Sequence, residues 1–156
     1  MIKGLHIFLL CASTSVMADT SKEVECLAKN IYHEARGEST KGQIAVGNVT
    51  LNRVKDSRYP NTICKVVTQA RKDKNNKIIL HKCQFSWYCD KYPDTMKDQR
   101  AKEKSFKLAK ALISGKISDV TKNSTHYHSK AVKPFWKDKL SKTVTIGIHH
   151  FYRWEK

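Results

Sequence analysis

Two glutamates, Glu34 and Glu38, stand in the stretch NIYHEARGE (residues 30–38) of a chain that is otherwise rich in lysine. Glu34 falls beside the apolar face of the helix expected over residues 20–35. A carboxyl group that is partly shielded from water has a raised pKa, because desolvation penalises its charged form. A glutamic acid that is protonated near neutral pH can serve as the general acid of a glycosidase. Helix position alone favours the alternative, an ordinary solvated glutamate paired with Arg36 or a nearby lysine.

A second cluster, CQFSWYC, places aromatic rings beside amide and hydroxyl groups between two cysteines. Rings such as Trp87 suit the C–H faces of sugars, and groups such as the amide of Gln84 suit their hydroxyls. The alternative is a hydrophobic plug that a disulfide holds in place.

Histidines form the third cluster, in THYHS and again in IHHFYRW near the C-terminus. In a strand, His126 and His128 point to the same face, as two metal ligands would. Together with His149 or His150 and a glutamate, they could form a zinc hydrolase site. HEARGE begins like the H-E-x-x-H motif but lacks its second histidine. Hydrogen bonding to the fold or to a substrate is therefore the leading interpretation.

The N-terminal segment, residues 1–18, has the pattern of a signal peptide: one lysine, a short apolar run and small residues up to Ala18. Residues 19–156 are enough for one compact domain. An even number of cysteines in an exported domain favours two disulfides, and the sequence does not select among the three possible pairings. The four are Cys26, Cys64, Cys83 and Cys89.

The formal net charge of +16 indicates a polyanionic partner. Nucleic acid is one candidate. Export to the periplasm or the extracellular space favours an anionic cell wall or membrane surface instead, so no nucleic acid partner is expected.

The spacing of apolar residues predicts the helices and strands that must position these clusters. A helix is predicted over Thr20–Ala35, with a Thr20/Glu23 capping box and a stop at Gly37. A second helix is predicted in STKGQIAVGNVTLNRV, with a Thr40/Gln43 capping box and Glu38 at its N-terminus. Its expected core face comprises Ile44, Gly47, Leu51 and Val54.

A short helix is expected to start at Thr62, and residues 71–93 are expected to form a loop-rich insertion with a small hairpin around KIILHKCQFSW. The stretch DTMKDQRAKEKSFKLAKALISG (94–115) predicts an amphipathic helix. THYHS and TVTIGIHHFYRW then alternate with period two and predict short strands. Helices first and a small late sheet indicate an α+β domain. The apolar face of the 94–115 helix comprises Met96, Phe106, Ala109, Leu112 and Ile113.

The three clusters, in this order, resemble the SleB-type cell-wall hydrolases, the spore-cortex-lytic family. The similar stretches run from about Leu27 to Arg153. They are LAKNIYHEARGE, GQIAVGNVTLNRV, YPNTICKVV, QFSW, THYH followed by PFW, and IGIHHFYR.

This resemblance implies a lysozyme-like fold and cleavage of peptidoglycan glycan strands by a lytic transglycosylase. Its single catalytic glutamate would be Glu34, without metal or cofactor, in a monomer. The resemblance further implies a set of groove-lining residues, namely Gln84, Trp87, His126, Tyr127, His128 and Tyr152. Family members with a separate peptidoglycan-binding domain differ from this chain, whose lysines would hold it to the wall instead. Two alternatives stay open: a zinc-dependent N-acetylmuramoyl-L-alanine amidase, and a non-catalytic basic wall- or nucleic-acid-binding module.

Overall fold

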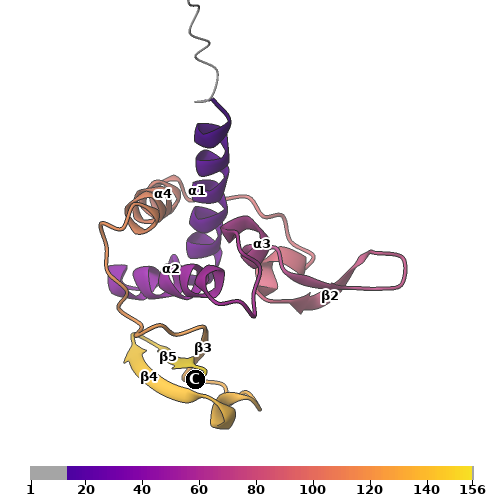
Figure 1. Ribbon diagram of the computed structural model, residues 1–156, viewed down its shortest axis with the longest axis vertical. Helices are drawn as coiled ribbons and strands as arrows, with labels where there is room; N and C mark the ends of the chain where they lie inside the picture. The colour runs from indigo at the N-terminus through magenta and orange to yellow at the C-terminus, as the bar shows by residue number, and fades with distance from the viewer. Residues whose placement is uncertain (1–13, 156) are drawn as a thin grey trace, which may run out of the picture.

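Within residues 14–155, the chain forms four α-helices, and a small three-stranded antiparallel sheet follows the last of them (Figure 1). The computed structural model describes residues 14–155. The three-stranded sheet has the order β3-β5-β4, with β5 in the centre. The predicted α+β class, with its late sheet, is confirmed. The helices are α1 (Thr14–Ala35), α2 (Thr40–Lys55), α3 (Ile63–Val67) and α4 (Gln99–Ile113), and the strands are β3 (His126–Ser129), β4 (Ser141–Ile146) and β5 (His149–Arg153).

A separate two-stranded hairpin leaves the helical part of the molecule between α3 and α4 (Figure 1). It consists of β1 (Ala70–Lys72) and β2 (Ile78–Cys83). A 3-10 helix, η1 (Ser86–Cys89), follows it, and a second one, η2 (Lys137–Lys139), precedes β4. The predicted hairpin is confirmed, although it begins earlier than the sequence indicated.

The helical core forms where α1 packs against α2, α3 and α4. Gly47 allows the close approach of α2, since a Cβ there would lie 2.5 Å from Cδ1 of Leu112 and 3.2 Å from Cδ1 of Ile31. Aromatic side chains from the segment after the hairpin complete this core. Its buried members include Leu27, Ala28, Ile31, Val66, Val67, Phe85, Trp87, Leu108, Ala109 and Leu112.

Helix α2 is buried on both sides because it lies between the helices and the sheet. On the predicted core face, Gly47 is buried, and Ile44, Leu51 and Val54 pack against the helical core but are only partly buried. On its other side, Ala45 and Val49 are fully buried against Ile146 and Phe151 of the sheet. The predicted helix and its apolar face are therefore confirmed, and the sequence missed only the second buried side of α2.

Three predicted helix starts are corrected. Helix α1 begins at Thr14, so Thr20 lies inside it, and the Glu23 carboxylate accepts backbone N–H groups at the start of α3 instead. Helix α2 is capped by Ser39, whose hydroxyl accepts from Gly42 N, one residue before the predicted cap. Helix α4 starts later than residue 94, behind the N-cap Asp98.

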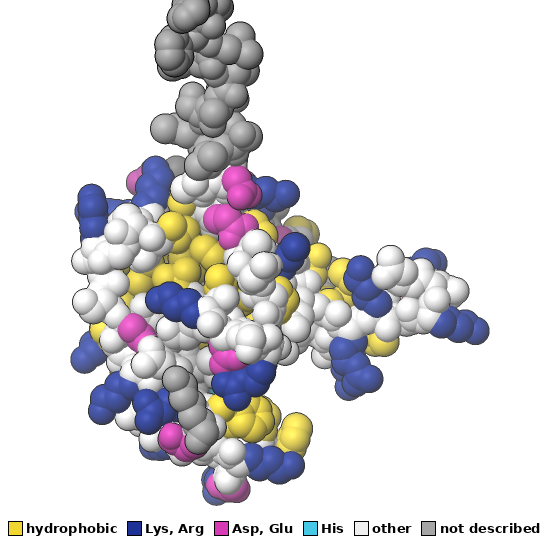
Figure 2. Space-filling view, in the orientation of Figure 1, with side chains coloured by type: hydrophobic (Ala, Val, Ile, Leu, Met, Phe, Trp, Pro, Cys, Tyr) yellow, Lys and Arg dark blue, Asp and Glu magenta, His cyan; other side chains and the backbone are white. Residues whose placement is uncertain are grey.

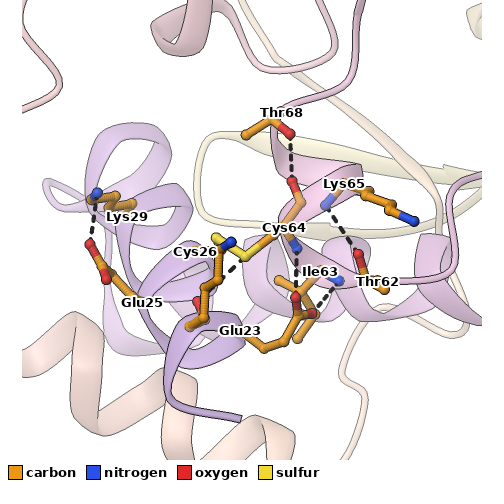
Figure 3. Close-up of a disulfide and its surroundings, with 10 residues drawn as sticks. Glu23, Glu25, Cys26, Lys29, Thr62, Ile63, Cys64, Lys65 and Thr68 are labelled. Carbon is orange, nitrogen blue, oxygen red and sulfur yellow. Dashed lines mark hydrogen bonds and ion pairs between the residues drawn. A yellow bond between two sulfur atoms is a disulfide. The ribbon is translucent and has the colours of Figure 1, made fainter. Parts of the chain in front are cut away.

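Two disulfides form, as predicted, and the structure supplies their pairing. Cys26 and Cys64 join α1 to α3, with 5.2 Å between their Cα atoms (Figure 3). Cys83 and Cys89 join the end of β2 to the end of η1. Both crosslinks brace the segments that surround the helical core.

Most of the predicted signal peptide, residues 1–18, lies outside the described residues, and α1 already includes residues 14–18. Within residues 14–155, no helix combines the length and the apolar character needed to cross a bilayer.

Candidate active site

Glu34 lies in the last turn of α1, beside the sheet. The Tyr127 hydroxyl, from β3, donates a hydrogen bond of 2.6 Å to Oε2 of Glu34. Pairing of β3 with β5 fixes this tyrosine, because Tyr127 is opposite Phe151 and their rings lie 5.7 Å apart. The sheet thus presents one phenol to the carboxyl group that ends the first helix.

The surroundings favour the protonated form of Glu34. Burial raises its pKa, while the hydrogen bond from Tyr127 and the positive charge of Arg53 act in the opposite direction. The burial effect is the largest, so the net shift is upward. Glu34 thus has the protonation behaviour expected of a general acid.

Arg53 is a buried cation behind this pair. Its Nε donates a 2.8 Å hydrogen bond to the carbonyl of Thr125, and its guanidinium lies over the rings of Tyr59 and Phe85. Its Nη1 is buried without a hydrogen-bond partner among the described residues. The nearby positive charge keeps the raised pKa of Glu34 from rising further.

Glu34 borders an open pocket of about 580 Å³ between the end of α1 and the segment that follows η1. Asp90 lines the same pocket and is the second carboxyl group in its wall, while Arg36 supplies a cation. The complete lining is Tyr32, His33, Glu34, Arg36, Ser86, Trp87, Asp90, Tyr92, Pro93, Thr95 and Lys97. A larger hollow of about 730 Å³ lies beside the C-terminal end of α2 and does not include Glu34.

Glu38 lies against the β4–β5 turn. Gly147 begins this two-residue turn with φ +57°, which favours glycine, and a Cβ there would lie 2.6 Å from Oε2 of Glu38. Burial lowers the pKa of the neighbouring His149, although the Glu38 charge opposes this shift. The His149 ring in turn lies 5.2 Å from that of Tyr127. Glu38 thus lies against the β4–β5 turn, whereas Tyr127 lies on β3 at the other edge of the sheet.

Alternation along β3 separates the predicted groove residues onto two faces. Tyr127 faces Glu34, whereas His126 and His128 face the other way. His126 pairs with Tyr152, and His128 Nε2 lies 3.0 Å from the Tyr152 hydroxyl. Trp136 covers these three residues, with ring centroids 5.1 to 5.6 Å away. Burial, with Arg53 and Arg58, lowers the pKa of His126 to about 4.

The two predicted residues of the CQFSWYC cluster differ in position. Trp87 lines the Glu34 pocket, but its indole N–H donates to Asn30 and its ring stacks on His33 at 4.6 Å. Much of the ring therefore belongs to the core. Gln84 is exposed and does not line the Glu34 pocket.

Sequence reasoning missed Arg53, Tyr32 and Tyr92 as residues around Glu34. Tyr92 is 79% exposed at the pocket wall, so its ring is accessible to a sugar. The aromatic residue before Pro93 in an irregular segment was the available signal. No comparable signal existed for Arg53, because an arginine near a helix C-terminus is usually solvated.

The histidines do not form a metal site within residues 14–155, since no three His, Cys, Asp or Glu side chains there are grouped to hold an ion. His128 uses both ring nitrogens, one near Ser129 O and one near the Tyr152 hydroxyl. The zinc alternative therefore lacks a ligand set in this part of the chain.

Comparison with known proteins gives one family. The sequence profile described as Cell Wall Hydrolase matches residues 37–152, a range that begins just after Glu34. The spore cortex-lytic enzyme of Bacillus cereus (strain ATCC 14579) is 38% identical over 52 residues, which are 33% of this chain. That match spans only 20% of the relative's own length.

Two solved structures have a similar fold. The catalytic domain of the Bacillus anthracis germination-specific lytic transglycosylase SleB matches with a TM-score of 0.59 and 26% identity, over 84% of this chain and 93% of that chain. The catalytic domain of the Bacillus cereus SleB protein matches with a TM-score of 0.56 and 24% identity, over 85% of this chain and 91% of that one.

Proposed function

The chain belongs to the cell wall hydrolase family, and we propose that it cleaves peptidoglycan glycan strands between N-acetylmuramic acid and N-acetylglucosamine. The observation that carries the proposal is the carboxyl group of Glu34, which has a raised pKa, accepts a hydrogen bond from Tyr127 and borders an open pocket. No cofactor is needed for this chemistry.

One carboxyl group suffices for the reaction. Protonated Glu34 donates its proton to the glycosidic oxygen, and the bond from that oxygen to the anomeric carbon of the muramic acid breaks. The resulting carboxylate takes the proton from the C6 hydroxyl of the same sugar, whose oxygen then bonds to the anomeric carbon. The products are a 1,6-anhydro sugar and a free hydroxyl on the leaving sugar, and no water is consumed.

Transglycosylation is preferred because the Bacillus anthracis relative of similar fold is described as a lytic transglycosylase. Hydrolysis is the second candidate, since Asp90 lines the same pocket as Glu34. Glycosidases that hydrolyse their substrates use two carboxyl groups, one of which activates water or attacks the sugar. The products distinguish these two reactions.

We propose that the protein is exported to the periplasm or the extracellular space and acts there as a monomer. The net charge of +16 would hold it to an anionic wall or membrane surface. Attraction between exposed charges is screened by salt, so wall binding should weaken steeply as salt is added. Salt-insensitive binding would contradict this part of the proposal.

The test is mass analysis of purified peptidoglycan after digestion, with the Glu34→Gln variant as the inactive control. Anhydro-muramyl ends are expected from the wild type alone. New reducing ends would assign hydrolysis. Freed stem peptides that a chelator abolishes would assign the zinc amidase, and an unchanged wall would leave only a basic binding module.

A further inference from the structure

Residues 71–82 of the β1–β2 hairpin form an exposed arm that the proposed cleavage reaction does not use. Every residue from 71 to 82 is exposed, and Figure 2 shows the arm projecting from the body. No residue of this range lines either of the two hollows described above. The arm therefore serves neither the helical core nor the Glu34 pocket.

The arm is strongly cationic. It carries five Lys or Arg side chains against a single carboxylate, and Figure 2 shows the cations along its length. The carboxylate, Asp73, accepts hydrogen bonds from the backbone of Asn75 and Lys77 and so holds the turn. The cations are Arg71, Lys72, Lys74, Lys77 and Lys82.

Three consecutive apolar side chains are exposed among these cations. Ile78, Ile79 and Leu80 keep 39%, 38% and 47% of their surface in contact with solvent. Strand pairing is irregular here, because Ala70 pairs with Cys83 whereas Lys72 already pairs with Ile78. The longer strand of this irregularity contains Ile79 and Leu80, and bulges change the direction of side chains locally.

The base of the arm is held firmly. The Cys83–Cys89 disulfide ties the end of β2 to the end of η1, and Gln84 N donates to Gln69 O across the base of the arm. Trp87, within the disulfide loop, is anchored in the core through Asn30. The residues at the base of the arm are therefore held in place relative to the helical core, and the apolar and cationic side chains extend from this base.

We propose that the β1–β2 arm binds the surface of an anionic lipid bilayer, with Ile79 and Leu80 entering the interface and the lysines contacting headgroup phosphates. Apolar groups ringed by lysine and arginine are the pattern of proteins that lie on membrane surfaces. The alternative binding partner is a hydrated anionic wall polymer. It would pair with the lysine charges but leave the apolar side chains without an apolar contact. Pairing with another strand is disfavoured, because edge lysines oppose it.

The experiment is co-sedimentation of the full chain with vesicles of equal parts phosphatidylethanolamine and phosphatidylglycerol, and with phosphatidylcholine vesicles. Binding to the anionic vesicles alone is expected. Lys74→Gln/Lys77→Gln should weaken it by about fivefold per lysine. Ile79→Ser/Leu80→Ser should weaken it by at least about tenfold.

The matched control is Lys107→Gln/Lys110→Gln, which removes the same charge from exposed positions of α4. It should change vesicle binding by less than about twofold. An equal loss in the control, or full binding by Ile79→Ser/Leu80→Ser, would overturn the proposal in favour of dispersed charge or an anionic polymer. Absence of vesicle binding by the wild type would overturn it outright.

Digestion of purified peptidoglycan separates this proposal from the proposed function. The arm variants should digest it like the wild type, since no residue from 71 to 82 lines the Glu34 pocket. Loss of vesicle binding with intact digestion supports the arm, whereas failure of digestion by the wild type affects only the glycan-cleaving proposal.

Discussion

Tyr127 and Glu34 are 93 positions apart in the sequence, and the Tyr127 hydroxyl donates a 2.6 Å hydrogen bond to Oε2 of Glu34. This contact joins the end of α1 to the first strand of the sheet. It also lowers the pKa of the carboxyl group, against the larger upward effect of burial. One bond therefore contributes both to the position of Glu34 and to its readiness to release a proton.

Glu34→Gln should abolish most of the activity, because an amide cannot donate the proton to the glycosidic oxygen. General acid–base catalysis contributes about 10²–10⁴-fold, so a loss of that size is expected in the release of glycan fragments. Asp94→Asn, at another carboxyl group near His33, is the matched control. A variant with the activity of the wild type would contradict the assigned role.

The same substitution should stabilise the fold at neutral pH. A raised folded-state pKa means that Glu34 favours folding when protonated, and this contribution is lost as pH rises from the ordinary value through the raised one. Glutamine does not titrate. The difference in unfolding free energy, Glu34→Gln variant minus wild type, should therefore grow between about pH 4 and about pH 8. Chemical denaturation at both pH values measures it, and a pH-independent difference would argue against a buried titrating group.

Tyr127→Phe should move the alkaline limb of the activity profile to higher pH. The hydrogen bond from Tyr127 favours the charged form of Glu34, so its loss raises the pKa of that carboxyl group further. Activity that requires the protonated acid then persists to higher pH. The measurement is the rate of glycan cleavage as a function of pH. The quantity compared is the pH at which the rate falls to half of its maximum on the alkaline side, which does not depend on the maximum itself.

Tyr152→Phe is the control for this shift. Tyr152 is also a sheet tyrosine, but its hydroxyl lies near His128 on the face away from Glu34. The alkaline limb of the activity–pH profile should stay at the wild-type pH in the Tyr152→Phe variant, even if substrate binding changes. A limb that moves to lower pH in Tyr127→Phe would reverse the stated sign and overturn the interpretation.

The sequence predicted the elements better than their ends. Apolar spacing located α1 through Leu27 and Ile31, and both side chains are fully buried. The start of α1 was missed because Glu23, predicted to close a capping box with Thr20, accepts backbone N–H groups at the start of α3 instead, where Thr62 is the N-cap as predicted. Local patterns cannot reveal a carboxylate that serves a helix 40 residues away in the chain.

The site was predictable only in part, for a related reason. Helix position located Glu34 beside an apolar face, but its partner Tyr127 comes from a strand whose orientation depends on pairing with β5. Period-two alternation did predict that His126 and His128 share a face. Which face meets the helices is decided by the burial of Phe151 against Ala45 and Val49, a long-range packing event.

Removal of the Cys26–Cys64 disulfide should destabilise the fold more than removal of the Cys83–Cys89 disulfide. The first crosslink joins positions 38 residues apart and the second only 6, and a longer closed loop restricts the unfolded chain more strongly. Chain entropy gives about 4 kcal/mol for the first and about 2 kcal/mol for the second. Paired Cys→Ala substitutions, compared by denaturant unfolding under oxidising conditions, measure both.

Each disulfide pair is the matched control of the other, since the same atoms are removed in both. The Cys26→Ala/Cys64→Ala variant should still fold, because Glu23 continues to accept the backbone N–H groups of Ile63 and Cys64 and holds α3 against α1. Glycan cleavage well below its unfolding temperature should be kept, as neither cysteine lines the Glu34 pocket. A larger loss for the Cys83–Cys89 pair would mean that the base of the hairpin, rather than the α1–α3 contact, limits stability.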